Sequence, residues 1–216
     1  MNRYDAVIFD LDGTLLNTLE DLKNAINHAL VSCGFAARTL DEVRRFVGNG
    51  ARKLAQRAVP QGSDEKDVSR VLDAFHQYYA LHSNDLTAPY PGIMDMLEAL
   101  GKAGVQVAVG SNKPHAQVQS LCRDYFGIAL AFGDREGIRR KPEPDAVLDV
   151  MNTLGVSAER TLYVGDSDVD VMTARNARVD CAAVLWGFRS QEELREAGAQ
   201  TFVSTAEELT ALIVRA

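Results

Sequence analysis

The stretch Val7-Ile8-Phe9-Asp10-Leu11-Asp12-Gly13-Thr14-Leu15 is an apolar run that ends at two carboxylates one residue apart. The apolar and aromatic residues between Ala6 and Leu11 predict a central strand. In an open α/β sheet, ligands bind beyond the carboxyl ends of the strands, so both acids would lie at the rim of a site. Two carboxylates in one place need a proton, a cation or a metal to offset their repulsion.

Composition narrows the class of protein. The 216 residues are 46% hydrophobic and 25% charged, which is ordinary for a soluble globular chain. The net charge of −7, without a run of Lys or Arg, argues against nucleic-acid binding. Apolar runs stay well below the ~20 residues of a membrane span, and the early strand leaves no room for a signal peptide. We therefore expect a cytoplasmic protein. Cys33, Cys122 and Cys181 are predicted to be free, buried thiols.

After Asp12 the hydrophobic pattern becomes helical. Leu19, Leu22, Ile26 and Leu30 recur at helical spacing, and residues 64–81 form a further amphipathic pattern. Residues 16–87 are therefore predicted to be a helical domain inserted between the two parts of an α/β core, residues 1–15 and 88–216. Such an insertion would act as a lid over the strand ends.

From residue 93 onward, predicted helices and strands alternate. The strands are expected at 105–109, 129–132, 161–164, 182–185 and 201–203. The helices are expected at 93–101, 114–125, 144–154, 169–177, 191–197 and 206–214. This alternation predicts right-handed βαβ units and a Rossmann-like parallel sheet, so the fold class is α/β with an all-α insertion.

Polar clusters follow four of the predicted strands. They are Asp10-x-Asp12-Gly13-Thr14, Ser111-Asn112-Lys113-Pro114, Lys141-Pro142 and Gly165-Asp166-Ser167-Asp168-Val169-Asp170. Because parallel strands end at the same edge of a sheet, we expect the clusters to converge on one crevice. Taken singly, Ser111 could be a helix cap, Lys141 a solvated lysine, and Asp166 and Asp170 partners of a helix N-terminus. Their order at successive strand ends favours a shared site.

The clusters supply the groups that phosphoryl transfer needs. Ser111 and the helix start at Pro114 would offer a hydroxyl and free N–H groups to a phosphoryl oxygen. Lys141 would add a compact positive charge. Asp166 beside Asp10 would make a hard-oxygen site suited to Mg²⁺. A carboxylate nucleophile, a second acid, a hydroxyl, a lysine and a metal together compose a phosphoryl-transfer site.

These four motifs resemble those of the haloacid dehalogenase superfamily of phosphatases, and the resemblance runs over nearly the whole chain. The acid at Asp12 separates the phosphatases from the true dehalogenases, and the helical insertion resembles the C1 cap of the superfamily. The resemblance implies that Asp10 attacks phosphorus to form an aspartyl-phosphate. It implies that Asp12 protonates the leaving alcohol and then deprotonates the attacking water.

The same resemblance implies the roles of the remaining site residues. Mg²⁺ would be held by Asp10, the backbone carbonyl of Asp12, and Asp166. Ser111 and Lys141 would hold the transferring phosphoryl group. The supporting residues would be Thr14, Asn112 and Asp170, the last orienting Lys141 or a metal-bound water.

Within the superfamily, residues 15–22, 46–50 and 184–189 resemble phosphoglycolate phosphatases. Arg178 departs from that pattern, which has glycine there, and predicts a strained helix C-cap. Phosphoglycolate carries a carboxylate besides its phosphate, so the cap should present a cationic or N–H-rich patch. Its candidate residues are Gly48, Asn49, Gly50 and Arg52. The alternative, that Arg52 belongs to a solvated helix face, stays open.

Other activities of the superfamily also stay open. They are a pyrophosphatase, a nucleotide or sugar-phosphate phosphatase, and a β-phosphoglucomutase-like phosphotransferase. A receiver-type signalling domain uses similar groups, but it places adjacent acids at the first strand and lacks a large helical insertion there. The expected partner is a small phosphorylated metabolite, neither nucleic acid nor membrane, and the expected assembly is a monomer or a homodimer.

Overall fold

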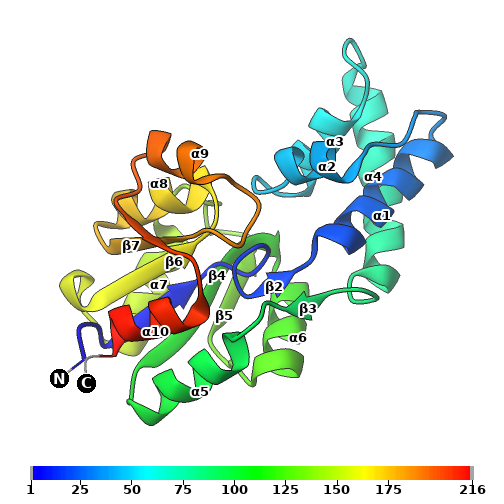
Figure 1. Cartoon of the computed structure of the whole chain (residues 1–216). Helices are drawn as coiled ribbons and strands as arrows, with labels where there is room; N and C mark the ends of the chain where they lie inside the picture. The colour runs from blue at the N-terminus through cyan, green and yellow to red at the C-terminus, as the bar shows by residue number, and fades with distance from the viewer. Residues whose placement is uncertain (1, 215–216) are drawn as a thin grey trace. The chain divides into compact units, whose positions relative to one another are not determined.

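The computed structural model describes residues 2–214 and divides into two compact units (Figure 1). Met1–Leu15 and Pro89–Ala216 form the first unit, and Leu16–Ala88 form the second. The first unit alternates strands with helices, whereas the second consists mainly of helices.

A six-stranded parallel sheet forms the centre of the first unit, in the order β5-β4-β1-β6-β7-β8. The strands are β1 (Ala6–Phe9), β4 (Gln106–Pro114), β5 (Ala131–Asp134), β6 (Thr161–Gly165), β7 (Asp180–Val184) and β8 (Thr201–Val203). All four residues of β1 are buried between β4 and β6, which explains why this strand is a continuous apolar run. The predicted parallel α/β fold is confirmed.

Helices flank this sheet. They are α5 (Ile93–Lys102), α6 (His115–Phe126), α7 (Asp145–Leu154), α8 (Asp168–Ala177), α9 (Gln191–Glu196) and α10 (Ala206–Ile213), with a short 3₁₀ turn, η1 (Ala158–Arg160). Ile8 of β1 and Tyr163 of β6 pack with Val147 and Val150 of α7 and with Ala174 of α8. This cluster excludes water from the sheet directly below the ends of β1 and β6.

The second unit contains the helices α1 (Leu19–Ser32), α2 (Leu40–Phe46), α3 (Ala51–Ala58) and α4 (Glu65–His82). Leu22, Ile26 and Leu30 form the buried side of α1, which packs against α4, as their spacing predicts. The strands β2 (Leu16–Asn17) and β3 (Ala88–Pro89), which the sequence did not predict, pair in a separate two-stranded sheet. That this unit acts as a cap stays a prediction.

A buried carboxylate holds the two ends of the second unit together. Asp21, in the first turn of α1, accepts hydrogen bonds from the backbone N–H groups of Leu86 and Thr87 and from the Thr87 hydroxyl. Asp21 is 2% exposed, and bonds to an ionised acceptor are stronger than neutral ones. The beginning and the end of this unit are therefore fixed side by side.

Some local expectations change. β4 extends to Pro114, so α6 begins at His115, and Ser111 is not the helix cap that the sequence suggested. Arg178 has φ 59° at the end of α8, which confirms the expected strained C-cap.

The three cysteines are free as predicted. Cys122 is buried, whereas Cys33 and Cys181 are half-buried and not buried as expected. Among residues 2–214, we find no helix with the length and apolar character that crossing a bilayer requires.

Candidate active site

Asp10 lies at the carboxyl end of β1. Its backbone N–H donates to the carbonyl of Val164 at 2.8 Å, so pairing with β6 continues through this residue. Its Oδ1 accepts from the N–H of Leu11 at 2.7 Å and lies 2.9 Å from Nζ of Lys141. The residue is 8% exposed, which leaves a small accessible face on a firmly held carboxylate.

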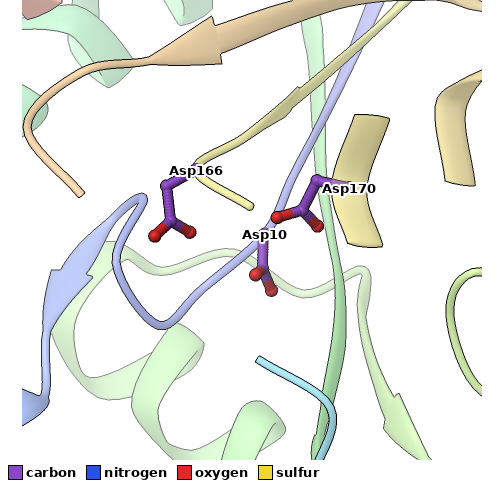
Figure 2. Close-up of side chains that lie close together, drawn as sticks. All are labelled: Asp10, Asp166 and Asp170. Carbon is purple, nitrogen blue, oxygen red and sulfur yellow. The ribbon is translucent and has the colours of Figure 1, made fainter. Parts of the chain in front are cut away.

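Asp166 and Asp170 approach Asp10 from the end of β6 and the start of α8 (Figure 2). One carboxylate oxygen of each residue lies within 4.8 Å of the other two. Asp166 accepts hydrogen bonds from the Thr14 hydroxyl at 3.2 Å and from the backbone N–H of Phe188 at 2.8 Å. The structure therefore brings together acids from the first and fourth motifs.

Two glycines make room for Asp166. A Cβ atom at Gly187 would lie 2.2 Å from Cβ of Asp166, and one at Gly13 would lie 2.3 Å from Oδ2 of Asp166. Gly13 also has φ +85°, a conformation that side chains disfavour. The glycine that follows Asp12 is thus required by the approach of the third acid.

Lys141 occupies the centre of the buried charges. Its Nζ donates to Oδ1 of Asp170 at 2.8 Å and to the hydroxyl of Tyr163 at 3.1 Å, besides its contact with Asp10. The side-chain amide of Asn112 accepts from the N–H of Lys141 at 2.9 Å and donates to its carbonyl at 3.1 Å. Asn112 therefore positions the backbone that carries the lysine.

Asp170 holds Lys141 in place. Its Oδ1 accepts from Lys141 and Tyr163, and its Oδ2 accepts from the N–H and the hydroxyl of Ser167 at 3.1 and 2.5 Å. Because each of its oxygens accepts hydrogen bonds from two donors of the protein, Asp170 is suited to orienting the lysine.

The electrostatics of this cluster favour a divalent cation. Burial raises the pKa of Asp10 to about 7, although Lys141 opposes the shift, and burial raises the pKa of Asp166 well above its usual range. Burial disfavours the charge of Lys141, but Asp10 and Asp170 outweigh it and hold the lysine pKa well above its ordinary value. Three buried carboxyl groups cluster here, and the ammonium of Lys141 pairs with two of them, Asp10 and Asp170. Their oxygens match the hard ligands that Mg²⁺ and similar ions take.

Lys113, which was not among the predicted site residues, contacts both Asp12 and Ser111. Nζ of Lys113 lies 3.0 and 3.3 Å from the two carboxylate oxygens of Asp12, and the N–H of Lys113 donates to the hydroxyl of Ser111 at 3.3 Å. Tyr163 was missed as well, because a tyrosine inside an apolar strand looks like an ordinary core residue. A lysine beside a conspicuous Ser-Asn pair was the signal available for Lys113.

A bulge in β4 explains how three successive residues are placed beside the site. Gly110 lies opposite Phe132 and Pro114 lies opposite Asp134, so residues 111–113 face the single residue Gly133 of β5. Bulges bend a strand and change the direction of its side chains. A Cβ atom at Gly133 would lie 2.5 Å from the carbonyl oxygen of Lys113. This glycine therefore permits the close contact between the two strands.

The remaining candidates, Gly48, Asn49, Gly50 and Arg52, belong to the second unit. Gly48 and Gly50 have φ of 118° and 82°, and Gly50 begins α3 as a cap without a side chain. Arg52 forms an ion pair with Glu65, and its side chain is 48% exposed. That pair agrees with the alternative of a solvated helix face. Substrate binding by these residues stays a prediction.

A sequence model of the haloacid dehalogenase-like hydrolases matches residues 7–184, from β1 to the end of β7. The chain belongs to this family. It is 39% identical over 191 residues to a phosphoglycolate phosphatase of Pseudomonas putida, covering 84% of this chain and 70% of the relative. It is 38% identical over 200 residues to phosphoglycolate phosphatase 1 of Pseudomonas aeruginosa, covering 88% and 72%.

A crystal structure from Lactobacillus delbrueckii subsp. bulgaricus has the same fold as this hydrolase. Its TM-score is 0.93 at 37% identity, and the match covers 98% of this chain and 99% of that one. That protein carries the phosphoglycolate phosphatase name provisionally. The sequence-based recognition of the family is confirmed, and so is the assignment of the chain to the hydrolases.

Proposed function

We propose that this hydrolase is a Mg²⁺-dependent phosphatase that converts 2-phosphoglycolate to glycolate and phosphate. The observation that carries the proposal is the buried carboxylate of Asp10, held by Lys141 and by the N–H of Leu11, with Asp12 two residues further on. The names of the relatives in Pseudomonas putida and Pseudomonas aeruginosa support the choice of substrate.

In the proposed reaction, an oxygen of Asp10 attacks phosphorus and the bond from phosphorus to the alcohol oxygen breaks. Asp12 gives its proton to that oxygen, so that glycolate leaves as a neutral alcohol at this position. Ser111 and Lys141 hold the phosphoryl oxygens during the transfer. Water then attacks the aspartyl-phosphate, Asp12 accepts the proton of that water, and Asp10 recovers its electron pair as phosphate leaves.

The acids present fit a resident Mg²⁺. Asp10, Asp166 and the backbone carbonyl of Asp12 would hold the ion, which supplies positive charge against the phosphoryl oxygens. Thr14 donates to Asp166, Asn112 pairs with the backbone of Lys141, and Asp170 fixes its ammonium. We assign these three residues supporting roles, because each fixes a group that would touch the metal or the phosphoryl.

The carboxylate of phosphoglycolate needs its own binding group. We propose Gly48, Asn49, Gly50 and Arg52 for this role, acting from a helical cap. Replacing Arg52 by Ala should then raise KM for phosphoglycolate more than KM for a phosphate ester that lacks a carboxylate. Unchanged turnover of phosphoglycolate by this variant would remove Arg52 from the proposal. We further propose that the enzyme acts in the cytoplasm as a monomer or a homodimer.

A phosphate-release panel tests the proposed activity. Purified enzyme with Mg²⁺ is given 2-phosphoglycolate, pyrophosphate, nucleoside monophosphates and sugar phosphates, and the Asp10→Asn variant serves as the blank. We expect the highest kcat/KM for 2-phosphoglycolate. A higher value for another compound would replace the substrate, and release that depends on added sugar bisphosphate would indicate a phosphotransferase. No release from any compound would refute the phosphatase.

A further inference from the structure

Lys113 and Asp12 form an ion pair within the first unit, in which the lysine is buried and the aspartate is half-buried. The ammonium lies 3.0 Å from Oδ1 and 3.3 Å from Oδ2 of Asp12, and the two side chains are 2% and 16% exposed. A buried ammonium that loses its partner is costly, so Lys113 keeps this contact through small fluctuations. The pair thus restricts the rotation of the Asp12 side chain.

The backbone of Lys113 is itself firmly placed. It sits in the bulge of β4 opposite Gly133, whose N–H donates to Nδ1 of His115 at 3.1 Å. Its own N–H donates to the hydroxyl of Ser111. The ammonium is therefore carried by the carboxyl end of β4. Asp12 lies in the turn that follows β1, where the N–H of Leu15 donates to the carbonyl of Leu11.

We propose that Lys113 is a positioning residue for proton transfer by Asp12. This inference rests on the proposed phosphatase activity and extends it to a residue with no assigned role. The hydrolytic step depends on it most, because one of the two Asp12 oxygens that contact the ammonium must then accept the proton of the attacking water. Water forms the new bond to phosphorus, the bond between Asp10 and phosphorus breaks, and the water proton passes to Asp12. Lys113 exchanges no proton and directs the accepting oxygen.

The variant Lys113→Met retains the length of the side chain and removes its charge. Proton transfer by a positioned group contributes about 10²–10⁴-fold, so losing its orientation should lower kcat by about 10–100-fold. KM should change by less than about threefold, because Lys113 does not touch the substrate in this scheme. Lys113→Arg should recover part of the rate. The matched control is Lys102→Met, an exposed lysine paired with Glu98, which should retain the activity of the parent enzyme.

The choice of leaving group separates positioning from a purely structural role. With p-nitrophenyl phosphate the first step needs little proton donation, since p-nitrophenolate is a good leaving group. Rapid mixing of Lys113→Met should therefore show a burst of about one p-nitrophenolate per enzyme before slow turnover. That burst reports accumulation of the aspartyl-phosphate. General damage to the fold would slow both steps and produce no burst.

A double-mutant cycle completes the test. If Lys113 acts through Asp12, adding Lys113→Met to Asp12→Asn should lower kcat by less than about twofold further. The double variant also removes both charges, so it tests the proposal if Lys113→Met alone does not fold. Independent, multiplying losses would overturn the proposal, as would a Lys113→Met enzyme within twofold of the parent. Failure of the parent enzyme to release phosphate would instead refute the proposed function.

Discussion

The phenol oxygen of Tyr163 lies 3.1 Å from Nζ of Lys141 and accepts a hydrogen bond from it. The same hydroxyl lies 3.2 Å from the carbonyl oxygen of Gly110 and 3.2 Å from Oδ1 of Asp170. Tyr163 is completely buried in β6. Its hydroxyl therefore joins β4, β6 and α8 beneath the lysine and limits where the ammonium can lie.

Tyr163→Phe should lower kcat/KM for the best substrate about three- to tenfold. The change removes one acceptor from Lys141, and a net hydrogen bond is worth about 0.5–1.5 kcal/mol. The aromatic ring remains to fill the core, so the fold should persist. Steady-state kinetics and thermal unfolding of the purified variant measure the two effects separately.

Tyr4→Phe is the matched control. Tyr4 is also buried and donates from its hydroxyl to Asp180 at 2.7 Å, but it precedes β1, at the opposite end of that strand from Asp10. We expect it to change stability and leave kcat/KM unchanged. Equal kinetic losses in both variants would mean that Tyr163 contributes only to folding.

Gly187→Ala should weaken metal binding and activity by at least tenfold. The added Cβ would meet Asp166 at 2.2 Å and the carbonyl of Gly13 at 2.6 Å, so one of the two must move. Displacing the Asp166 carboxylate, which we propose as a metal ligand, should raise the Mg²⁺ concentration needed for half-maximal activity. Activity titrations with MgCl₂ measure this concentration.

Gly101→Ala provides the comparison. Gly101 lies in α5, and a Cβ there meets nothing within 4 Å. Alanine favours the helix over glycine by about 1 kcal/mol, so this variant should be more stable and equally active. A Gly187→Ala enzyme with an unchanged Mg²⁺ requirement would contradict the role assigned to the close approach at Asp166.

Arg178→Gly should stabilise the protein by roughly 1 kcal/mol. Arg178 has φ 59° at the C-cap of α8, where its Cβ is unfavourable and glycine is not. Thermal or urea unfolding detects the difference. Arg175→Gly, within the same helix, should destabilise by a similar amount, because glycine costs about 1 kcal/mol there. The same sign for both substitutions would contradict the strain at Arg178.

Metal-free enzyme should become more stable, relative to Asp10→Asn, as the pH falls from 8 to 5. Folding raises the pKa of Asp10 to about 7, compared with about 3.9 in an unfolded chain. Between these values the folded state binds the extra proton, so its stability increases as pH falls and decreases as pH rises through 7. The change should be roughly 2–3 kcal/mol. Urea unfolding in EDTA across this pH range measures it.

At pH 8, added Mg²⁺ should stabilise the parent enzyme more than it stabilises Asp10→Asn. A ligand that binds only the folded state stabilises it in proportion to the logarithm of its concentration. The rise in Tm should be larger for the parent enzyme, because Asp10→Asn replaces a charged carboxylate at the proposed metal site by a neutral amide. A parent enzyme whose Tm does not respond to millimolar Mg²⁺ would argue against a metal site at Asp10 and Asp166.

Much of the fold and part of the site could be predicted from local patterns. The apolar run before Asp10 and the alternation after residue 93 predicted the parallel sheet, because burial on both faces demands continuous apolar strands. The carboxyl end of β4 could not be predicted, since the bulge opposite Gly133 depends on β5, which lies further along the chain. The strands β2 and β3 were missed because each has only two residues, which is too short for a recognisable pattern.

The sequence alone determined the chemical types at the site and their order along the chain. Asp10, Lys141 and Asp166 follow the strands β1, β5 and β6, and Ser111 lies near the carboxyl end of β4. In a parallel sheet those ends share one edge. Tertiary structure alone decided which of these side chains contact one another. It paired Asp12 with Lys113, placed Tyr163 beneath Lys141, and occupied both oxygens of Asp170. These contacts join residues up to 101 positions apart, and only packing brings such residues within hydrogen-bonding distance.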